Sequence, residues 1–189
     1  MVMDNIQFKI DKALKDFWKN YLPEEYNNDN LLKEDSLKCL LYYHLRTCLN
    51  DSWLKRHRIR IFPEFNLQQG KRADIAIVQL FPSPQRIGKH LSNCVEKVIA
   101  IIELKFKSAD VVDDFYIDVK KLHAYSKIYP DCQLYAGFIH EELYNDNNCS
   151  WFDGRQTSKW AKGRVSELLG YWDEATDSFT TKVISYNEF

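Results

Sequence analysis

The first fifty residues place apolar side chains at helical spacing. Residues 5–20 repeat apolar positions every three or four residues, and we expect this helix to end before Pro23. Residues 22–30 are rich in Asn, Asp and Glu and therefore predict a loop. A second helix is expected from about Leu31 to Asn50, with an inward stripe formed by Leu37, Leu41, His44, Leu45 and Cys48.

A two-residue alternation then predicts strands. Residues 58–67 and 72–80 alternate apolar and polar positions, and residues 68–71 between them suit a hairpin turn. Residues 81–96 contain Pro, Gly and several polar side chains, so we expect a long surface loop there. Residues 97–106 are apolar on both faces, which is typical of a central strand.

The second half of the chain continues with helices and strands. An apolar stripe predicts a helix over residues 110–129, closed by Pro130. The remaining predicted elements are a strand over 133–140, a polar segment over 141–148, a weak helix over 155–163 and two strands over 165–172 and 179–186.

This order of elements predicts an α/β protein with a mixed central sheet flanked by helices and a C-terminal β-hairpin extension. No linker divides the chain, so we expect one domain over residues 1–189. Its core should span about residues 31–140, and its C-terminal extension about residues 150–189.

Composition and charge narrow the class of protein. The chain has 11 Tyr, 11 Phe and 5 Trp, which favours a packed core over disorder. The formal net charge of −1 provides no global basic field for a polyanion, although a site with several carboxylates would itself lower this charge. No apolar run approaches the ~20 residues that span a bilayer, so we expect a cytoplasmic protein without membrane contact.

The cysteines point to the same compartment. Five of them lie far apart without any CxxC pair, which predicts reduced thiols in the cytoplasm. We expect Cys39 and Cys48 to be small buried apolar side chains. We interpret His44, on the apolar face of its helix, as a core histidine in preference to a metal ligand.

Isolated charges inside two apolar strands carry most of the functional information. Asp74 interrupts the second strand, and Glu103 and Lys105 interrupt the third. Such charges are costly unless they are paired, bound to metal or solvated at a sheet end. Alternate residues share a face, so Glu103 and Lys105 should point the same way, and Asp74 joins them if the strands pair.

Two carboxylates and one ammonium group suit phosphodiester hydrolysis. Carboxylate oxygens hold Mg²⁺ or Mn²⁺ and leave positions open for water and phosphate. A neighbouring lysine can orient the attacking water or stabilise the developing charge. A nearby metal would also lower the pKa of that lysine, which makes a role as base conceivable.

The sequence Glu103-Leu104-Lys105, preceded by Asp74 on the neighbouring strand, resembles the PD-(D/E)XK nuclease superfamily, also called restriction-endonuclease-like. The order of a helix, three strands, a helix and a strand over about residues 31–140 is similar to the core of that family. The segment Asp118–Leu122 resembles a pattern found in some of its branches. One departure is Ala73, where the motif has Pro.

The resemblance implies a Mg²⁺-dependent nuclease that hydrolyses DNA, with Mn²⁺ as a substitute metal. Asp74 and Glu103 would be metal ligands, together with the backbone carbonyl of Leu104. Lys105 would act on the attacking water. Glu34, three residues before Leu37 on the inward stripe, matches the position of an additional acid. Glu64 and Lys121 are weaker candidates.

Simpler structural roles are open for each of these residues. Asp74 would then pair with Arg72 or Lys71, and Glu103 with Lys105. Glu34 would stabilise a helix start through the dipole, Glu64 would be a solvated edge residue and Lys121 a surface lysine.

Two alternatives to an active nuclease follow from the same resemblance. The first is a catalytically inactive protein of this fold that binds protein or nucleic acid. The second is a subunit of a larger nuclease complex or a homodimer, with the hairpin over residues 165–186 as the docking surface. The basic run Lys55–Arg60 would either contact phosphates or form a solvated strand entry.

Overall fold

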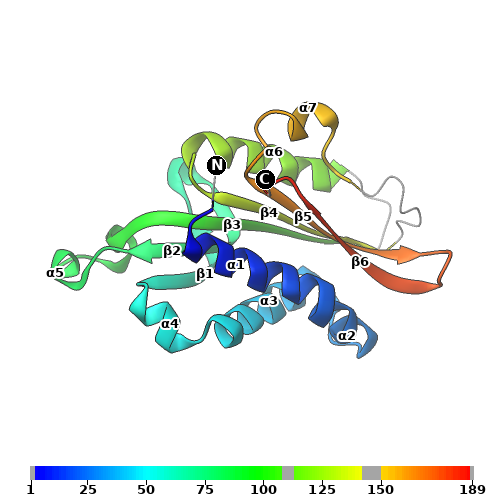
Figure 1. Cartoon of the computed structure of the whole chain (residues 1–189), viewed down its shortest axis with the longest axis horizontal. Helices are drawn as coiled ribbons and strands as arrows, with labels where there is room; N and C mark the ends of the chain where they lie inside the picture. The colour runs from blue at the N-terminus through cyan, green and yellow to red at the C-terminus, as the bar shows by residue number, and fades with distance from the viewer. Residues whose placement is uncertain (1–2, 108–112, 142–149, 188–189) are drawn as a thin grey trace.

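A computed structural model describes residues 3–107, 113–141 and 150–187. Within these residues the strands form one mixed sheet in chain order (Figure 1). The strands are β1 (Ile59–Asn66), β2 (Arg72–Leu80), β3 (Val95–Lys107), β4 (Gln133–His140), β5 (Val165–Asp173) and β6 (Ser178–Ser185). β1, β2 and β3 form an antiparallel meander, β3, β4 and β5 are parallel, and β6 returns antiparallel to β5.

Helices cover both faces of this sheet (Figure 1). One face carries α1 (Asn5–Asp16), the π-helical turn η1 (Phe17–Tyr21), α2 (Leu22–Asn27), α3 (Glu34–Leu49) and α4 (Asp51–Arg56). The other face carries α6 (Asp113–Ile128) and α7 (Gly154–Thr157). The predicted α/β protein with a mixed sheet and a C-terminal β5–β6 hairpin is therefore confirmed, and the hairpin continues the main sheet.

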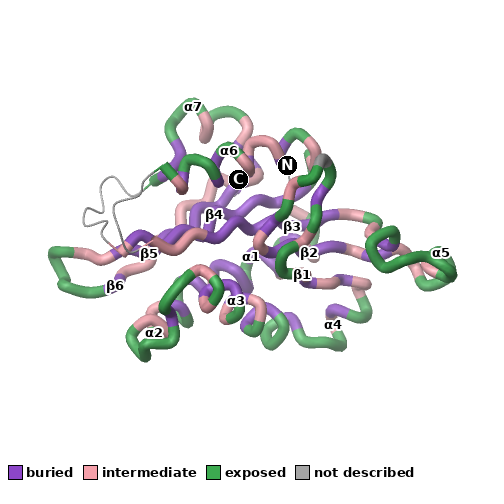
Figure 2. The backbone as a smooth tube through the Cα atoms, turned by 180° about the vertical axis from the view of Figure 1, so that it is seen from behind, coloured by how far each residue is buried: buried purple, intermediate pink, exposed green. Residues whose placement is uncertain are grey.

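The alternation along β3 explains why there are two cores. Ile102 and Leu104 pack against α1 and α3, whereas Ile101 packs on the opposite face with residues of α6. Both faces of the strand are covered, as the apolar run predicts. Figure 2 shows the interior strands buried along most of their length, while exposure is concentrated in helices and turns.

A buried polar cluster joins α1 to β4 and to the end of the described chain. The Tyr135 hydroxyl and the Asn187 amide each donate a hydrogen bond of 2.9 Å to Asp11 Oδ1. Lys15 Nζ lies 2.8 Å from Asp11 Oδ2 and balances its charge. These buried groups are satisfied by one another, so we assign the cluster a structural role.

Several local predictions were wrong. The first helical segment ends before Pro23 as expected, but the loop predicted over residues 22–30 is wrong, since residues 22–27 form α2 and proline is compatible with the first turn of a helix. The expected loop at 81–96 contains α5 (Ser83–Arg86) and the 3₁₀ turn η3 (Leu91–Cys94). The polar segment over 141–148 lies outside the described residues except for Glu141, and so does Cys149.

The cysteine prediction was also wrong. Cys39 and Cys48 are exposed, whereas Cys94 and Cys132 are buried. The helical spacing correctly predicts that the Cys48 side chain points toward His44. The direction of a side chain does not by itself determine whether a neighbouring element covers it.

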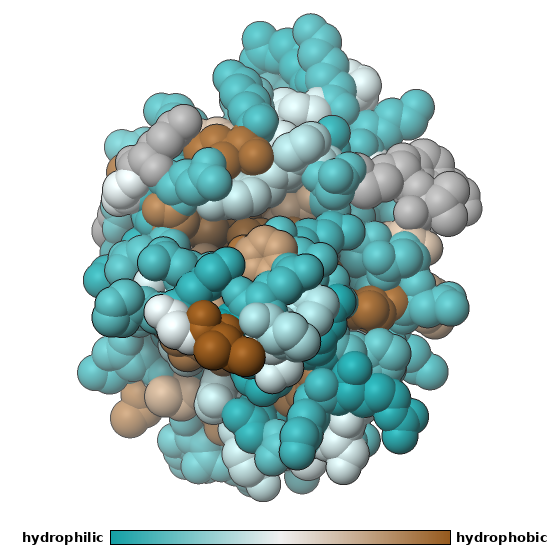
Figure 3. Space-filling view, turned by 90° about the vertical axis from the view of Figure 1, so that its left-hand side faces the viewer, coloured by the Kyte–Doolittle hydropathy of each residue, from teal (hydrophilic) through white to brown (hydrophobic). Residues whose placement is uncertain are grey.

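The surface is mostly hydrophilic on the side that carries α5, with small separate hydrophobic patches (Figure 3). Ile87 and Leu91, in the β2–β3 connection, are among the exposed large apolar side chains. Scattered apolar residues of this kind are normal on protein surfaces. Among the residues that the structure describes, no helix is long and apolar enough to cross a membrane.

We predict that Gly137→Ala lowers the free energy of unfolding by about 1–3 kcal/mol, because the added methyl group overpacks the core. Gly137 lies opposite Leu104, and a Cβ there would lie 2.6 Å from Leu104 Cδ2 and 3.0 Å from Trp18 Cη2. Urea denaturation measures the loss. Gly154→Ala is the control, since a Cβ at Gly154 meets nothing within 4 Å. Equal stability of the two variants would contradict the packing described here.

Candidate active site

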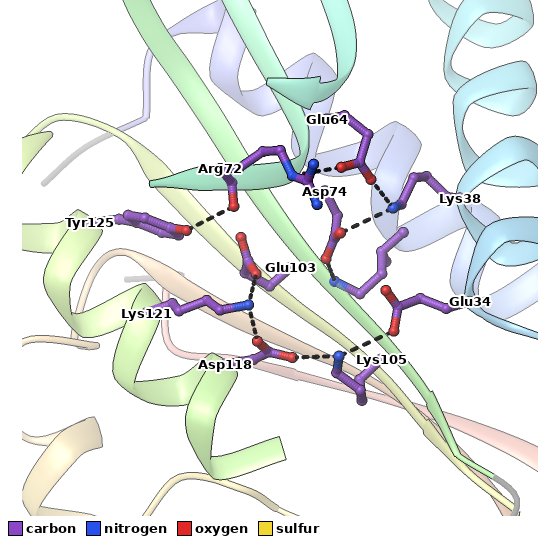
Figure 4. Close-up of polar contacts among 11 residues, drawn as sticks. Glu34, Lys38, Glu64, Arg72, Asp74, Glu103, Lys105, Asp118, Lys121 and Tyr125 are labelled. Carbon is purple, nitrogen blue, oxygen red and sulfur yellow. Dashed lines mark hydrogen bonds and ion pairs between the residues drawn. The ribbon is translucent and has the colours of Figure 1, made fainter. Parts of the chain in front are cut away.

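The pairing of β2 with β3 brings the strand charges together. Ile75 lies opposite Ile102, and the backbone N–H of Leu104 donates a 2.8 Å hydrogen bond to Asp74 Oδ2. Glu103 and Lys105 both point toward α6, as two-residue alternation predicts. The structure therefore places Asp74, Glu103 and Lys105 at one end of the paired strands (Figure 4).

Glu103 is the most deeply buried member of the group, with 0% of its surface exposed. Lys121 Nζ lies 3.3 Å from Glu103 Oε2, while Glu103 Oε1 is buried without a hydrogen-bond partner among the residues that the structure describes. Burial, reinforced by the Asp74 carboxylate and partly opposed by Lys121, raises the pKa of Glu103 to about 8. A buried carboxyl oxygen without a partner is costly and indicates a role beyond packing.

Lys105 is held between two carboxylates from different helices. Its Nζ lies 3.2 Å from Glu34 Oε2 and 3.2 Å from Asp118 Oδ2. Burial lowers the pKa of Lys105, but the charges of Asp118 and Glu34 outweigh burial, so the net shift is upward. The side chain is therefore a positively charged donor in the metal-free protein.

Glu34 is the first residue of α3, where a carboxylate also suits the helix dipole. Its side chain reaches Lys105, so α3 adds an acid to the group.

A second series of ion pairs includes Asp74. Lys38, one helical turn after Glu34, lies 3.1 Å from Asp74 Oδ1 and also pairs with Glu64. Arg72 Nε lies 2.8 Å from the other oxygen of Glu64. Glu64 has a positive φ of 52°, which L-residues adopt rarely and which clusters at functional sites.

Sequence reasoning missed Lys38 and did not select Asp118 as a site residue. Asp118 is buried and contacts both Lys105 and Lys121, at 3.2 and 2.6 Å. Helical spacing carried the signal, because Asp118 is three residues after Phe115 on the buried face of α6. Lys38 likewise precedes buried Leu41 by three residues.

The described residues do not form the ion pairs that the simpler structural roles of Asp74 and Glu103 would require. Glu103 pairs with Lys121, and Lys105 pairs with Glu34 and Asp118, so these two strand residues do not form a salt bridge with each other. Asp74 pairs with Lys38, and Arg72 pairs with Glu64. Lys121 is half-buried, and Glu64 is partly exposed but paired at both oxygens.

The ion pairs form one layered group, which we call the carboxylate cluster (Figure 4). Its members are Glu34, Lys38, Glu64, Arg72, Asp74, Glu103, Lys105, Asp118 and Lys121. Glu103 and Asp118 form the buried floor, and Arg72, with 65% of its side chain exposed, lies at the rim. Five carboxyl groups face four cationic groups, so with every acid ionised the cluster carries an excess negative charge.

A basic cavity adjoins the rim. Its volume is about 630 Å³, and its lining includes Lys71, Lys120, His123 and Lys127. Lys71 Nζ lies 6.0 Å from the ring centre of Tyr125, whose hydroxyl donates a 3.2 Å hydrogen bond to the Arg72 carbonyl oxygen. This cavity places three lysines beside the carboxylate cluster despite the nearly neutral chain.

The raised pKa of Glu103 makes a prediction about stability. Between its ordinary pKa near 4.5 and about 8, the folded state keeps a proton that the unfolded state has released. The stabilising contribution is complete below pH 4.5 and is lost as pH rises through 8. Glu103→Gln should therefore match the wild type at pH 4 and unfold at a higher temperature at pH 8.5.

Thermal unfolding in a chelator measures this difference, at about 2–4 °C for each kcal/mol in a chain of this size. Asp35→Asn, an exposed change beside Glu34, is the control. Parallel curves of melting temperature against pH for wild type and Glu103→Gln would contradict the assigned environment.

Comparison of the chain with protein-family models, curated proteins and solved structures finds no match. The function is therefore inferred from the chemistry of the carboxylate cluster and the fold that positions it.

Proposed function

We propose that this protein is a Mg²⁺-dependent nuclease of the PD-(D/E)XK superfamily that hydrolyses DNA phosphodiester bonds. The observation that carries the proposal is the buried Glu103 carboxyl beside Asp74 and Lys105, one oxygen of which has no hydrogen-bond partner in the described part of the chain. A buried carboxyl in this position lowers the stability of the folded protein. Such a cost is expected of a residue that is retained for catalysis.

The arrangement of elements supports a restriction-endonuclease-like fold. The segment α3, β1, β2, β3, α6, β4 has the element order that the resemblance implies for the core. β3 and β4 are parallel and are connected through α6, while β1, β2 and β3 form a meander. β5 and β6 extend the sheet beyond that core.

The donor set fits a hard divalent cation. Asp74 and Glu103 supply carboxylate oxygens, and the Leu104 carbonyl between Glu103 and Lys105 supplies a third ligand of the kind that Mg²⁺ prefers. The Glu103 oxygen without a partner among the described residues favours a cation, because a bound cation would stabilise the ionised form of this carboxyl despite its raised pKa. Such an ion, when bound, neutralises charge on the phosphate and activates water.

The protein's own residues account for the remaining functions. Lys105, fixed by Glu34 and Asp118, is protonated and can donate hydrogen bonds to water and to a phosphate oxygen. Its raised pKa favours orientation and charge stabilisation over a role as base in the metal-free protein. Lys38 and Lys121 balance Asp74 and Glu103 before a cation binds, and must release them when it does.

The basic cavity supports a nucleic-acid substrate. Lys71, Lys120 and Lys127 can neutralise backbone phosphates, which dominate the affinity of proteins for DNA. The cavity is linked to the rim of the cluster through Tyr125, whose ring lies near Lys71 and whose hydroxyl donates to the Arg72 carbonyl oxygen.

A catalytically inactive protein of this fold is the second candidate. The pairing of both proposed ligands with lysines favours it, because Lys38 and Lys121 supply the charge that a cation would otherwise supply. This candidate predicts no Mg²⁺ binding by calorimetry, no cleavage and a stable complex with another macromolecule. Mg²⁺ binding that is lost in Glu103→Ala would exclude it.

Cleavage of supercoiled plasmid and single-stranded DNA, with Mg²⁺ or Mn²⁺, tests the nuclease directly. We expect cleavage by the wild type and a loss of about 10²–10³-fold or more in Asp74→Asn and Lys105→Ala, because each removes a preorganised charge. Asp35→Asn should keep full activity, since Asp35 pairs only with exposed Lys33 among the described ion pairs. Unchanged cleavage in Asp74→Asn and Lys105→Ala would rule out the assigned site.

DNA binding tests the basic cavity separately. The double variant Lys120→Glu, Lys127→Glu should weaken binding and reduce the salt slope by about two, because each lost phosphate contact changes the slope by about 0.9. Fluorescence anisotropy in Ca²⁺ at several salt concentrations measures both effects. The control is Lys12→Glu, Lys19→Glu, an equal charge change on the helices of the opposite sheet face. Equal losses in the two double variants would contradict a localised surface.

A further inference from the structure

A second group of ligand-type side chains lies between α1 and α3. Asp16 is the last residue of α1, and His44 and Cys48 are one turn apart near the end of α3. A carboxylate oxygen, an imidazole nitrogen and the thiol sulfur all lie within 4.8 Å of one another. Cys48 Sγ is 3.3 Å from His44 Nε2.

The backbone and its neighbours hold this group in place. The π-helical turn η1 begins directly after Asp16, and such turns are rare and often lie at functional sites. Within η1, the Asn20 amide donates a 2.7 Å hydrogen bond to Asp16 Oδ1 and so orients this carboxylate. The ring centroid of Tyr21 lies 4.4 Å from that of His44, so the imidazole is fixed by packing.

We propose that Asp16, His44 and Cys48 bind one Zn²⁺-class transition-metal ion, with water as the fourth ligand. The inference does not depend on the proposed nuclease activity. Sulfur, nitrogen and oxygen ligands together favour Zn²⁺ or Co²⁺ over Mg²⁺ or Ca²⁺, and three protein ligands plus water is a common zinc arrangement. His44 is buried while Cys48 is exposed, so solvent can reach the group from one side.

The site is separate from the carboxylate cluster. His44 lies ten positions after Glu34 on the same helix, which corresponds to about 15 Å along the helix axis. Burial lowers the pKa of His44 and outweighs the opposing effects of Asp16 and the Ala13 backbone. Binding would release the thiol proton of Cys48, whose pKa is raised by burial and by Asp16.

Co²⁺ titration of the reduced, metal-free protein tests the site without reference to activity. We expect a near-ultraviolet thiolate-to-cobalt band that saturates at one equivalent and disappears when Zn²⁺ is added. Cys48→Ser should abolish the band and weaken Co²⁺ binding more than about 100-fold. Replacing a residue that only hydrogen-bonds to a metal ligand already weakens metal binding about 10–100-fold, and loss of a ligand should cost more. Asp16→Asn should weaken binding while keeping the band.

Cys39→Ser is the matched control, since Cys39 is also an exposed cysteine on α3 but lies outside the group. It should keep the band, and so should Glu103→Gln, which distinguishes this site from the nuclease ligands. Zn²⁺ at 100-fold excess over its Kd should raise the melting temperature by about 5–10 °C in wild type and not in Cys48→Ser. Absence of the band in wild type, or its persistence in Cys48→Ser, would overturn the proposal.

Discussion

The burial of Glu103 in the middle of the sheet is the constraint on which the proposed site depends. β3 is covered on both faces, so an ionised carboxylate there is removed from water and is costly. The folded chain limits this cost with one lysine and with a pKa raised to about 8. Oε1 of Glu103 accepts no hydrogen bond from the described residues, and a divalent cation would supply the missing partner.

The cations around the cluster are shared between carboxylates. Asp118 contacts both Lys105 and Lys121, and Lys38 contacts both Asp74 and Glu64. Sharing fixes long side chains that would otherwise be mobile, at the buried end where solvent screens least. The same sharing ties β2, β3, α3 and α6 together, so the geometry of the site depends on the packing of helices on both faces of the sheet (Figure 4).

The charged residues on the strands could be predicted from the sequence, because a charged residue stands out within an apolar strand. The two-residue alternation of a strand then tells which face of the sheet its side chain occupies. The helix residues were harder to predict. A charged residue on a helix is usually solvated, so Asp118 was recognised only as part of a motif, although its spacing places it on the buried face. The ion-pair partners of Lys38 could be identified only from the folded structure, because they lie on strands of the sheet. The loop predicted over residues 22–30 was wrong because Pro23 suits the start of a new helix as well as the end of the preceding one. The exposure of Cys48 depends on which elements cover it and cannot be predicted from its helical spacing alone.

Helix α3 contributes to two chemically different groups of side chains. Its first turns provide Glu34 and Lys38 to the carboxylate cluster, and its last turns provide His44 and Cys48 beside Asp16. A helix displaced at one end moves largely as a rod, so a ligand that shifts α3 at its C-terminal turns would alter the position of Glu34 relative to Lys105. Thermodynamic linkage requires any such effect to be mutual: occupation of either end would change the affinity of the other by the same factor.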